Sequence, residues 1–298
     1  MARSGRQFSI AAGEHEATVV DVGAGLRRYT HRGIDVTASY GEDDLPPKGA
    51  GAVLVPWPNR MRGGRYAFDG EQFQLALTEP LKANAIHGLG RWSRWVPVRH
   101  EASAVTLRLD IVAQDGWPFE VSVDVTYSLH PESGLAVSTT AVNNGSRRAP
   151  FGAGFHPYVS TGGVALDDVR VKVPARERLI LDEAKCPVGS QQVAGSPYDL
   201  RRGPKLRDLR IDDAFTGLSR TRHHSVVDVR MRRAGVQVWL DETFRFVQVY
   251  TLDLLAAGQP AIAVEPMTCA PDAFNSGDGL IVLDPGGSWT GVWGIQPY

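Results

Sequence analysis

The feature that most constrains this chain is a strict two-residue alternation of apolar and polar side chains between positions 121 and 129. The apolar positions are Val121, Val123, Val125, Tyr127 and Leu129. Serine, aspartate or threonine occupies each position between them. Because successive side chains of a β-strand point to opposite faces, this pattern predicts a strand with one buried face and one polar face. Such strands are typical of antiparallel sheets that pack on one side.

Other segments repeat this alternation, and turn signals separate them. The further predicted strands are Val105 to Ile111, Leu135 to Asn143, Val226 to Met231 and Val236 to Leu240. The turn dipeptides are Asp69-Gly70, Asn144-Gly145 and Ala234-Gly235. No amphipathic stretch is long enough to predict a helix between these strands. The sequence therefore favours an all-β fold, a large antiparallel sandwich, over a β-α-β architecture.

The region from Asp182 to Asp213 lacks this alternation. It is rich in proline, glycine, arginine and aspartate, which predicts a long ordered loop that crosses the sandwich. No internal repeat or low-complexity tract is visible in the 298 residues. Residues 1–298 are therefore predicted to form a single domain.

The charge balance and the cysteines exclude several classes of partner. The 32 basic and 33 acidic residues give a formal net charge of -1, so no global field attracts nucleic acid or an acidic membrane. A small neutral ligand fits this balance better. Cys186 and Cys269 form no Cys-x-x-Cys motif, and the charged N-terminus lacks the apolar stretch of a signal peptide. We expect a cytoplasmic protein, with no membrane or nucleic-acid partner, that is a monomer or homodimer.

His156 is the first candidate for chemistry. Gly152 and Gly154 precede it, and Pro157 restricts its backbone to extended conformations. A histidine held in this way could donate a proton near neutral pH. The alternative is a buried histidine that only hydrogen-bonds to the backbone, and the local sequence leaves both interpretations open.

Glu265 is the second candidate. It ends the apolar run Ala261 to Val264 and precedes Pro266, which predicts a carboxylate at the point where a buried strand leaves the sheet. Burial there would raise its pKa and make it a usable base. A surface glutamate at a strand end is the alternative. The turn residues and the phenylalanine within 271–275 favour a pocket wall.

Several polar side chains could hold a ligand. Asn59 and Arg60 follow a stiff Pro-Trp-Pro segment, which predicts that a loop presents them to vicinal hydroxyls. A solvated arginine is the alternative, and His87 is equally ambiguous. Gln248 alternates with valines, so an inward amide at this position needs a polar partner.

Asp212 and Asp213 are neighbours on a predicted strand. Adjacent side chains point to opposite faces, so only one of these carboxylates can enter a pocket. The alternative is a capping or turn pair.

Motifs for metals and cofactors are missing from the sequence. His223-His224 lack the spacing of a tetrahedral site or of His-Glu-x-x-His. Gly23-Ala24-Gly25 lacks the third glycine of a dinucleotide fingerprint, and there is neither a phosphate-binding loop nor a Gly-x-Ser-x-Gly elbow. The sequence predicts no metal and no cofactor. Glycoside hydrolysis by Glu265 and an aspartate stays open.

Taken together and in this order, these segments resemble the aldose 1-epimerase (galactose mutarotase) family. Asn59-Arg60 and Gly64-Arg65-Tyr66 are similar to the family's Asn-Arg-Ile/Met and Gly-x-Tyr/Phe motifs, and Ile86-His87-Gly88 to its Leu-His-Gly. His156-Pro157-Tyr158 resembles the central catalytic-histidine motif, and 212–215 the Asp-His/Asp-x-Phe motif. The segments 247–251, 264–266 and 271–275 complete the resemblance, which extends over residues 56–276.

This resemblance implies a fold and an activity. The fold would be a galactose mutarotase-like β-supersandwich, and the activity the cofactor-independent interconversion of the α and β anomers of a hexose or related aldose. By resemblance, His156 is the general acid and Glu265 the general base. The residues that would hold sugar hydroxyls are Asn59, Arg60, His87, Asp212 and Gln248. Many members have histidine at the place of Asp213, and Asp212 is assigned to the sugar by its spacing to Phe215. Near pH 7 we expect His156 to be partly protonated and Glu265 partly ionised.

Other functions remain open. A hexose-6-phosphate 1-epimerase needs extra basic residues for the phosphate, and Arg62, Arg65 and Arg91 are candidates. A non-catalytic carbohydrate-binding protein would stack a sugar on Trp57, Trp92 or Trp95. A glycosidase or polysaccharide lyase is less well supported, because no second strong acid or tyrosine base is identified. The sequence does not select the sugar, since discrimination between epimers depends on the geometry of the cleft.

Overall fold

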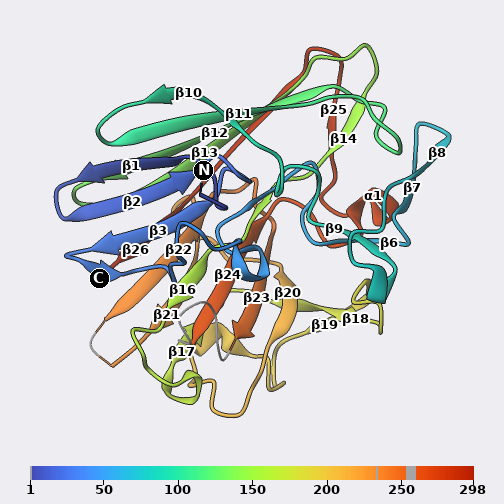
Figure 1. Ribbon diagram of the computed structural model, residues 1–298. Coiled ribbons are helices and arrows are strands. Elements are labelled where there is room, and N and C mark those ends of the chain that lie inside the picture. Colours follow the sequence, from blue (N-terminus) through green and yellow to red (C-terminus); the bar gives the residue numbers. More distant parts are fainter. Residues whose placement is uncertain (1, 233, 253–259) are drawn as a thin grey trace.

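The computed structural model describes residues 2–232, 234–252 and 260–298 (Figure 1). Within these ranges nearly all regular structure is antiparallel strand, which confirms the all-β prediction. The helical pieces are α1 (Ala273–Ser276) and the 3-10 turns η1 (Pro47–Gly49), η2 (Pro80–Lys82), η3 (Leu166–Asp168) and η4 (Leu200–Arg202). None of the described helices is long and apolar enough to cross a membrane.

Two eight-stranded sheets dominate the fold. The first has the order β10 (Val96–His100), β11 (Ala104–Ile111), β12 (Val121–His130), β13 (Gly134–Asn143), β26 (Ser288–Pro297), β22 (Gly235–Leu240), β21 (Ser225–Arg230) and β17 (Arg170–Lys172). The second path has the order β19 (Pro187–Gln192), β18 (Glu177–Leu181), β20 (Asp212–Thr216), β23 (Phe246–Leu252), β24 (Ala261–Met267), β15 (Gly154–Phe155) and β5 (Val53–Leu54), and β16 (Tyr158–Ser160) also pairs with β24.

Smaller sheets complete the molecule. A four-stranded sheet near the N-terminus contains β1 (Gln7–Ala12), β2 (His15–Val20), β3 (Leu26–His31) and β4 (Ile34–Asp35). The two-stranded pairs are β6 (Arg60–Arg62) with β9 (Asn84–Ile86), β7 (Arg65–Phe68) with β8 (Glu71–Gln74), and β14 (Ala149–Phe151) with β25 (Ile281–Leu283).

The two large sheets share one apolar core. Val125 of β12 belongs to the same buried cluster as Val249 of β23 and Val264 of β24. Side chains alternate along each strand, so Gln248 and Glu265 point to the opposite face of the second sheet. One face of this sheet therefore packs on the core, and the other face carries polar groups.

The five strands predicted from alternation are all present. They correspond to β11, β12, β13, β21 and β22, and each boundary agrees to within one residue. Along β12 the buried positions are those of the apolar series. Asp69 and Gly70 form the two-residue turn between β7 and β8, and both have positive φ angles, as a turn of this kind requires. The single-domain expectation stays a prediction.

The predicted long loop from Asp182 to Asp213 is wrong in part. It contains the edge strand β19, which forms a hairpin with β18, and its last two residues begin β20. The side chains of β19 are almost all exposed, so this strand is held by backbone hydrogen bonds and buries no apolar series. For this reason a hydrophobic pattern could not reveal it.

Candidate active site

The register of the second sheet brings His156 and Glu265 together. His156 lies midway between Gly154 and Tyr158, through which β15 and β16 pair with β24. Glu265 lies midway between the two partners on β24, so it faces His156 directly. The distance from His156 Nε2 to Glu265 Oε1 is 3.5 Å.

The same register continues across the neighbouring strands. Gln248 of β23 is the cross-strand partner of Glu265, and Tyr250 is the partner of Asp212 on β20. Residues two apart on a strand share a face, so these side chains form one floor. They line a cavity of about 390 Å³ together with His156 and Tyr158. This size suits a small-molecule ligand.

Glu265 is not at the end of its strand, which corrects the prediction. β24 continues through Pro266 to Met267. The backbone N–H groups of Val264 and Thr268 donate to Pro157 O and Ala153 O, which flank β16 and β15. The backbone nitrogen of Pro266 faces the same side, where pairing is interrupted between β15 and β16 at His156. The missing N–H of the proline therefore removes no ladder hydrogen bond.

The glycines before His156 have a packing role. A Cβ atom on Gly154 would lie 2.5 Å from Pro58 Cβ, and one on Gly152 would lie 2.5 Å from Cys269 Sγ. Only glycine permits this close approach. The contact between Gly154 and Pro58 fixes the Pro-Trp-Pro segment, and hence Asn59, beside β15, which His156 follows directly.

Asn59 and His87 hold each other at the rim of the cavity. The backbone N–H of Asn59 donates to His87 Nδ1 (3.2 Å), and the backbone N–H of His87 donates to Asn59 O (2.8 Å). Burial lowers the pKa of His87 well below its usual value, so the ring is neutral. Because Nδ1 accepts a hydrogen bond, the proton is on Nε2, which makes His87 a donor.

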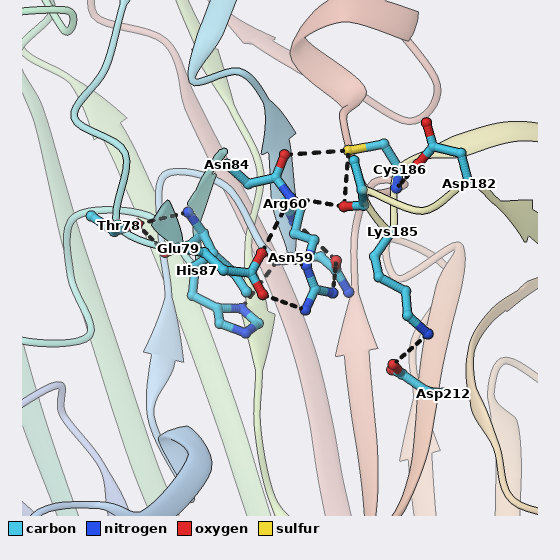
Figure 2. A network of polar contacts seen from close by, with 12 residues as sticks. Asn59, Arg60, Thr78, Glu79, Asn84, His87, Asp182, Lys185, Cys186 and Asp212 are labelled. Atoms are coloured by element: carbon cyan, nitrogen blue, oxygen red, sulfur yellow. Dashed lines mark hydrogen bonds and ion pairs between the residues drawn. The ribbon is translucent and has the colours of Figure 1, made fainter. Parts of the chain in front are cut away.

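Arg60 is bound by Glu79, a residue that the sequence did not single out. Arg60 Nε and Nη2 donate to the two carboxylate oxygens at 2.8 and 2.9 Å (Figure 2). Arg60 begins β6 and is half-buried, so neither the loop position nor the solvated alternative is correct. Glu79 lies in an irregular turn before Pro80, where no periodic signal marks it.

Asp212 and Asp213 point to opposite faces, as predicted. Asp212 lines the cavity and accepts a hydrogen bond from Gln248 Nε2 at 2.9 Å, which supplies the polar partner that the glutamine needs. Its other oxygen lies 3.1 Å from Lys185 Nζ (Figure 2). Asp213 instead pairs with Arg178 at 2.5 Å. Lys185 lies in the turn after β18, in the region predicted as loop, and was also missed.

Burial shifts the pKa values of His156 and Glu265. His156 is 5% and Glu265 2% exposed. Burial lowers the pKa of His156 to about 4, and it raises the pKa of Glu265 well above its usual value. Burial therefore favours the neutral imidazole of His156 over the imidazolium, and the protonated carboxyl of Glu265 over the carboxylate. This corrects the expectation of a partly protonated His156.

Several buried polar atoms around this pair have no protein partner. Among the described residues, His156 Nδ1, Glu265 Oε2 and the hydroxyl of Tyr158 make no hydrogen bond. The Tyr158 ring stacks on His156 with a centroid distance of 5.0 Å. Unsatisfied buried groups in one cavity are suited to bind a polar ligand. The described residues contain no group of three or more histidine, cysteine or acidic side chains arranged to hold a metal.

Of the arginines suggested for a phosphate and the tryptophans suggested for stacking on a sugar, only some line the cavity. Arg62 pairs with Asp182, and Arg65 lies at a different hollow, so of the three arginines suggested for a phosphate only Arg91 lines the cavity. Trp57 and Trp95 are buried in the core. Trp92 is 52% exposed and lines the cavity, so it is the tryptophan placed to contact a ligand.

The fold and the cavity together define a β-sandwich protein with a polar small-molecule site. The chain belongs to the aldose 1-epimerase family, whose model matches residues 6–296. The uncharacterized protein YihR of Escherichia coli (strain K12) is 33% identical over 287 residues, which cover 95% of this chain and 90% of that protein. Galactose mutarotase of Homo sapiens is 28% identical over 219 residues, or 69% of this chain and 63% of the human protein. The GalM/aldose epimerase homologue from C. elegans has the same fold, with a TM-score of 0.87 and 20% identity over 98% of both chains.

Proposed function

We propose that this protein is an aldose 1-epimerase that interconverts the α and β anomers of a hexose or related aldose. The observation that carries this proposal is the buried pair of His156 and Glu265. They face each other across 3.5 Å on the floor of a polar cavity.

The reaction opens and closes the sugar ring by moving two protons. Glu265 takes the proton of the anomeric hydroxyl O1, while His156 gives a proton to the ring oxygen O5. The bond between C1 and O5 breaks, and C1 becomes an aldehyde. Rotation about the C1–C2 bond followed by the reverse steps gives the other anomer. No electron or group leaves the sugar, so the reaction needs no cofactor.

The burial of the pair favours this ring opening. The form that reacts with the cyclic sugar has a protonated His156 and an ionised Glu265, and it is the minor tautomer of the resting pair. After both protons have moved, imidazole and carboxyl are neutral again. Burial stabilises this neutral form, so the energy of the pair falls as the ring opens.

The rim and floor of the cavity hold the sugar. His87 offers an N–H donor and Asp212 an acceptor, while Asn59, Arg60 and Gln248 complete a connected set of polar groups. Each is fixed by a neighbour, so binding a sugar does not require these side chains to be ordered first.

The test follows anomerisation by polarimetry and NMR. Freshly dissolved α-glucose, α-galactose and other aldoses are compared with and without protein. We expect acceleration of at least one sugar, and a loss of kcat of roughly 10²- to 10⁴-fold in His156→Asn and Glu265→Gln. His223→Asn and Glu242→Gln make the same chemical changes at exposed positions and serve as matched controls.

Two results would contradict the proposal. One is wild-type anomerisation in both His156→Asn and Glu265→Gln. The other is binding of sugars without acceleration of any of them, which would instead identify a carbohydrate-binding protein.

A further inference from the structure

The charged side chains that line the cavity do not cancel. Arg60 neutralises Glu79 through a bidentate ion pair, and Lys185 pairs with Asp212 at 3.1 Å. Burial favours the uncharged forms of both His156 and Glu265. Two cations that line the cavity, Arg91 and Lys48, are left over.

The acidic side chain that acts electrostatically on Arg91 is Glu79, and Arg60 already occupies both of its carboxylate oxygens. Within the described part of the chain the guanidinium of Arg91 makes no hydrogen bond and no ion pair, and it lies 5.6 Å from the centroid of the Trp92 ring. Burial lowers the pKa of Arg91, which shows that its charge is partly removed from water. A partly desolvated cation without a partner is unfavourable, so an anion brought by a ligand would be strongly favoured at this place.

Lys48 lies on the same side of the cavity. It is exposed on η1 and makes no ion pair with any residue that the structure describes. The next residue, Gly49, approaches the histidine so closely that a Cβ atom there would lie 3.5 Å from His156 Cδ2. Arg91 also influences His156: its positive charge contributes to the lowered pKa values of both His87 and His156.

This side of the cavity corresponds to one end of the sugar. In the proposed reaction His156 protonates O5, and O5 is bonded to C5, which carries the exocyclic carbon. A substituent on that carbon therefore lies near His156, away from the O1 that faces Glu265.

We propose that the cavity takes an aldose with an anionic group on the exocyclic carbon, such as a uronate or a sugar 6-phosphate, and that Arg91 and Lys48 bind this group. The inference rests on the proposed function. A guanidinium can bind a carboxylate or a phosphate through two parallel hydrogen bonds, whereas a neutral hydroxymethyl group leaves the charge unpaired.

The experiment compares neutral and anionic sugars of the same ring. Two-dimensional NMR exchange spectroscopy gives the anomerisation rates of glucose, glucuronate and glucose 6-phosphate, each corrected for the rate without protein. We expect kcat/KM to be at least roughly 10-fold higher for one anionic sugar than for glucose, since a charge-assisted hydrogen bond is worth about that factor or more. The two anionic sugars show whether the site prefers a carboxylate or a phosphate.

The variants identify the residues. Arg91→Gln and Lys48→Gln should each lower the ratio of anionic to neutral kcat/KM by roughly 10-fold, and Arg91→Lys should retain part of it. Arg65→Gln removes an exposed arginine at another hollow and should leave the ratio at the wild-type value. Circular dichroism and thermal unfolding check that each variant is folded.

The outcomes separate this inference from the proposed function. Equal rates for neutral and anionic sugars, with an unchanged ratio in Arg91→Gln, would overturn the anion site and leave the epimerase intact. If no aldose is converted, the proposed epimerase activity is wrong, and calorimetric titration then tests the anion site alone. Binding of glucuronate or glucose 6-phosphate that is lost in Arg91→Gln would support the anion site. No such binding would overturn both proposals.

Discussion

The pH dependence of folding stability reports whether His156 and Glu265 rest as a neutral pair. Burial raises the pKa of folded Glu265 above its ordinary value of 4.5. Between these two values the folded protein holds a proton that the unfolded chain has released. Stability therefore falls as pH rises above 4.5, by about 1.4 kcal/mol per pH unit, until the folded pKa is reached.

His156 acts in the opposite direction. Its pKa falls from 6.5 to about 4 on folding, so below pH 6.5 the unfolded chain binds a proton that the folded protein does not. Stability is therefore lost as pH falls from 6.5 towards 4. The full loss is roughly 3 kcal/mol, since each pKa unit corresponds to about 1.4 kcal/mol.

Two single variants separate these contributions. The free energy of unfolding in urea is measured from pH 5 to 8 for wild type, Glu265→Gln and His156→Asn. Relative to wild type, Glu265→Gln should gain stability as pH rises, whereas His156→Asn should gain stability as pH falls below 6.5. A change in packing shifts each curve by a constant and leaves its slope unchanged.

An ion pair in the resting protein would reverse both slopes. In that case folding would raise the pKa of His156 and lower that of Glu265, and removal of either partner would cost stability where both are charged. Such slopes would refute the neutral pair and the account of ring opening built on it. His223→Asn and Glu242→Gln should follow the wild-type curve throughout, because both side chains are exposed.

Four further variants test the surroundings of the pair. Asp212→Asn should lower kcat/KM by roughly 10- to 100-fold, because Asp212 lines the cavity. Asp213→Asn should leave kcat/KM near wild type and lower the free energy of unfolding by about 1–3 kcal/mol, because Asp213 pairs with Arg178 outside the cavity. Steady-state kinetics and urea unfolding separate the two effects. Gln248→Leu should cost about 1–3 kcal/mol of stability and also reduce kcat/KM, since it leaves the partners of a buried amide unpaired; unchanged kinetics would contradict its place in the binding floor. Gly154→Ala should lower stability by about 1–3 kcal/mol through its contact with Pro58, measured by thermal unfolding, and a stabilised variant would contradict this packing role.

Much of the fold and part of the site could be predicted from local sequence. The alternation at 121–129 identified β12 because its buried face is made of every second residue. Gln248 required a polar partner because it alternates with valines, and Asp212 and Asp213 had to separate because neighbours on a strand face opposite ways. These conclusions depend on geometry that repeats every two residues, which a sequence displays directly.

Other features depended on contacts between distant segments. Glu79 and Lys185 hold Arg60 and Asp212, yet each comes from an irregular turn that carries no periodic signal. The edge strand β19 was missed because it buries no apolar series. Partners of this kind become visible only when the chain is folded.

The sequence by itself determined an all-β chain and identified His156 and Glu265 as candidates for its chemistry. Only the tertiary structure decided that they face each other, because cross-strand register is set by the pairing of β15 and β16 with β24. Only the tertiary structure also decided that burial favours the neutral form of each group. A pKa depends on how far a group is removed from water and on which charges surround it, and both are properties of the folded cavity.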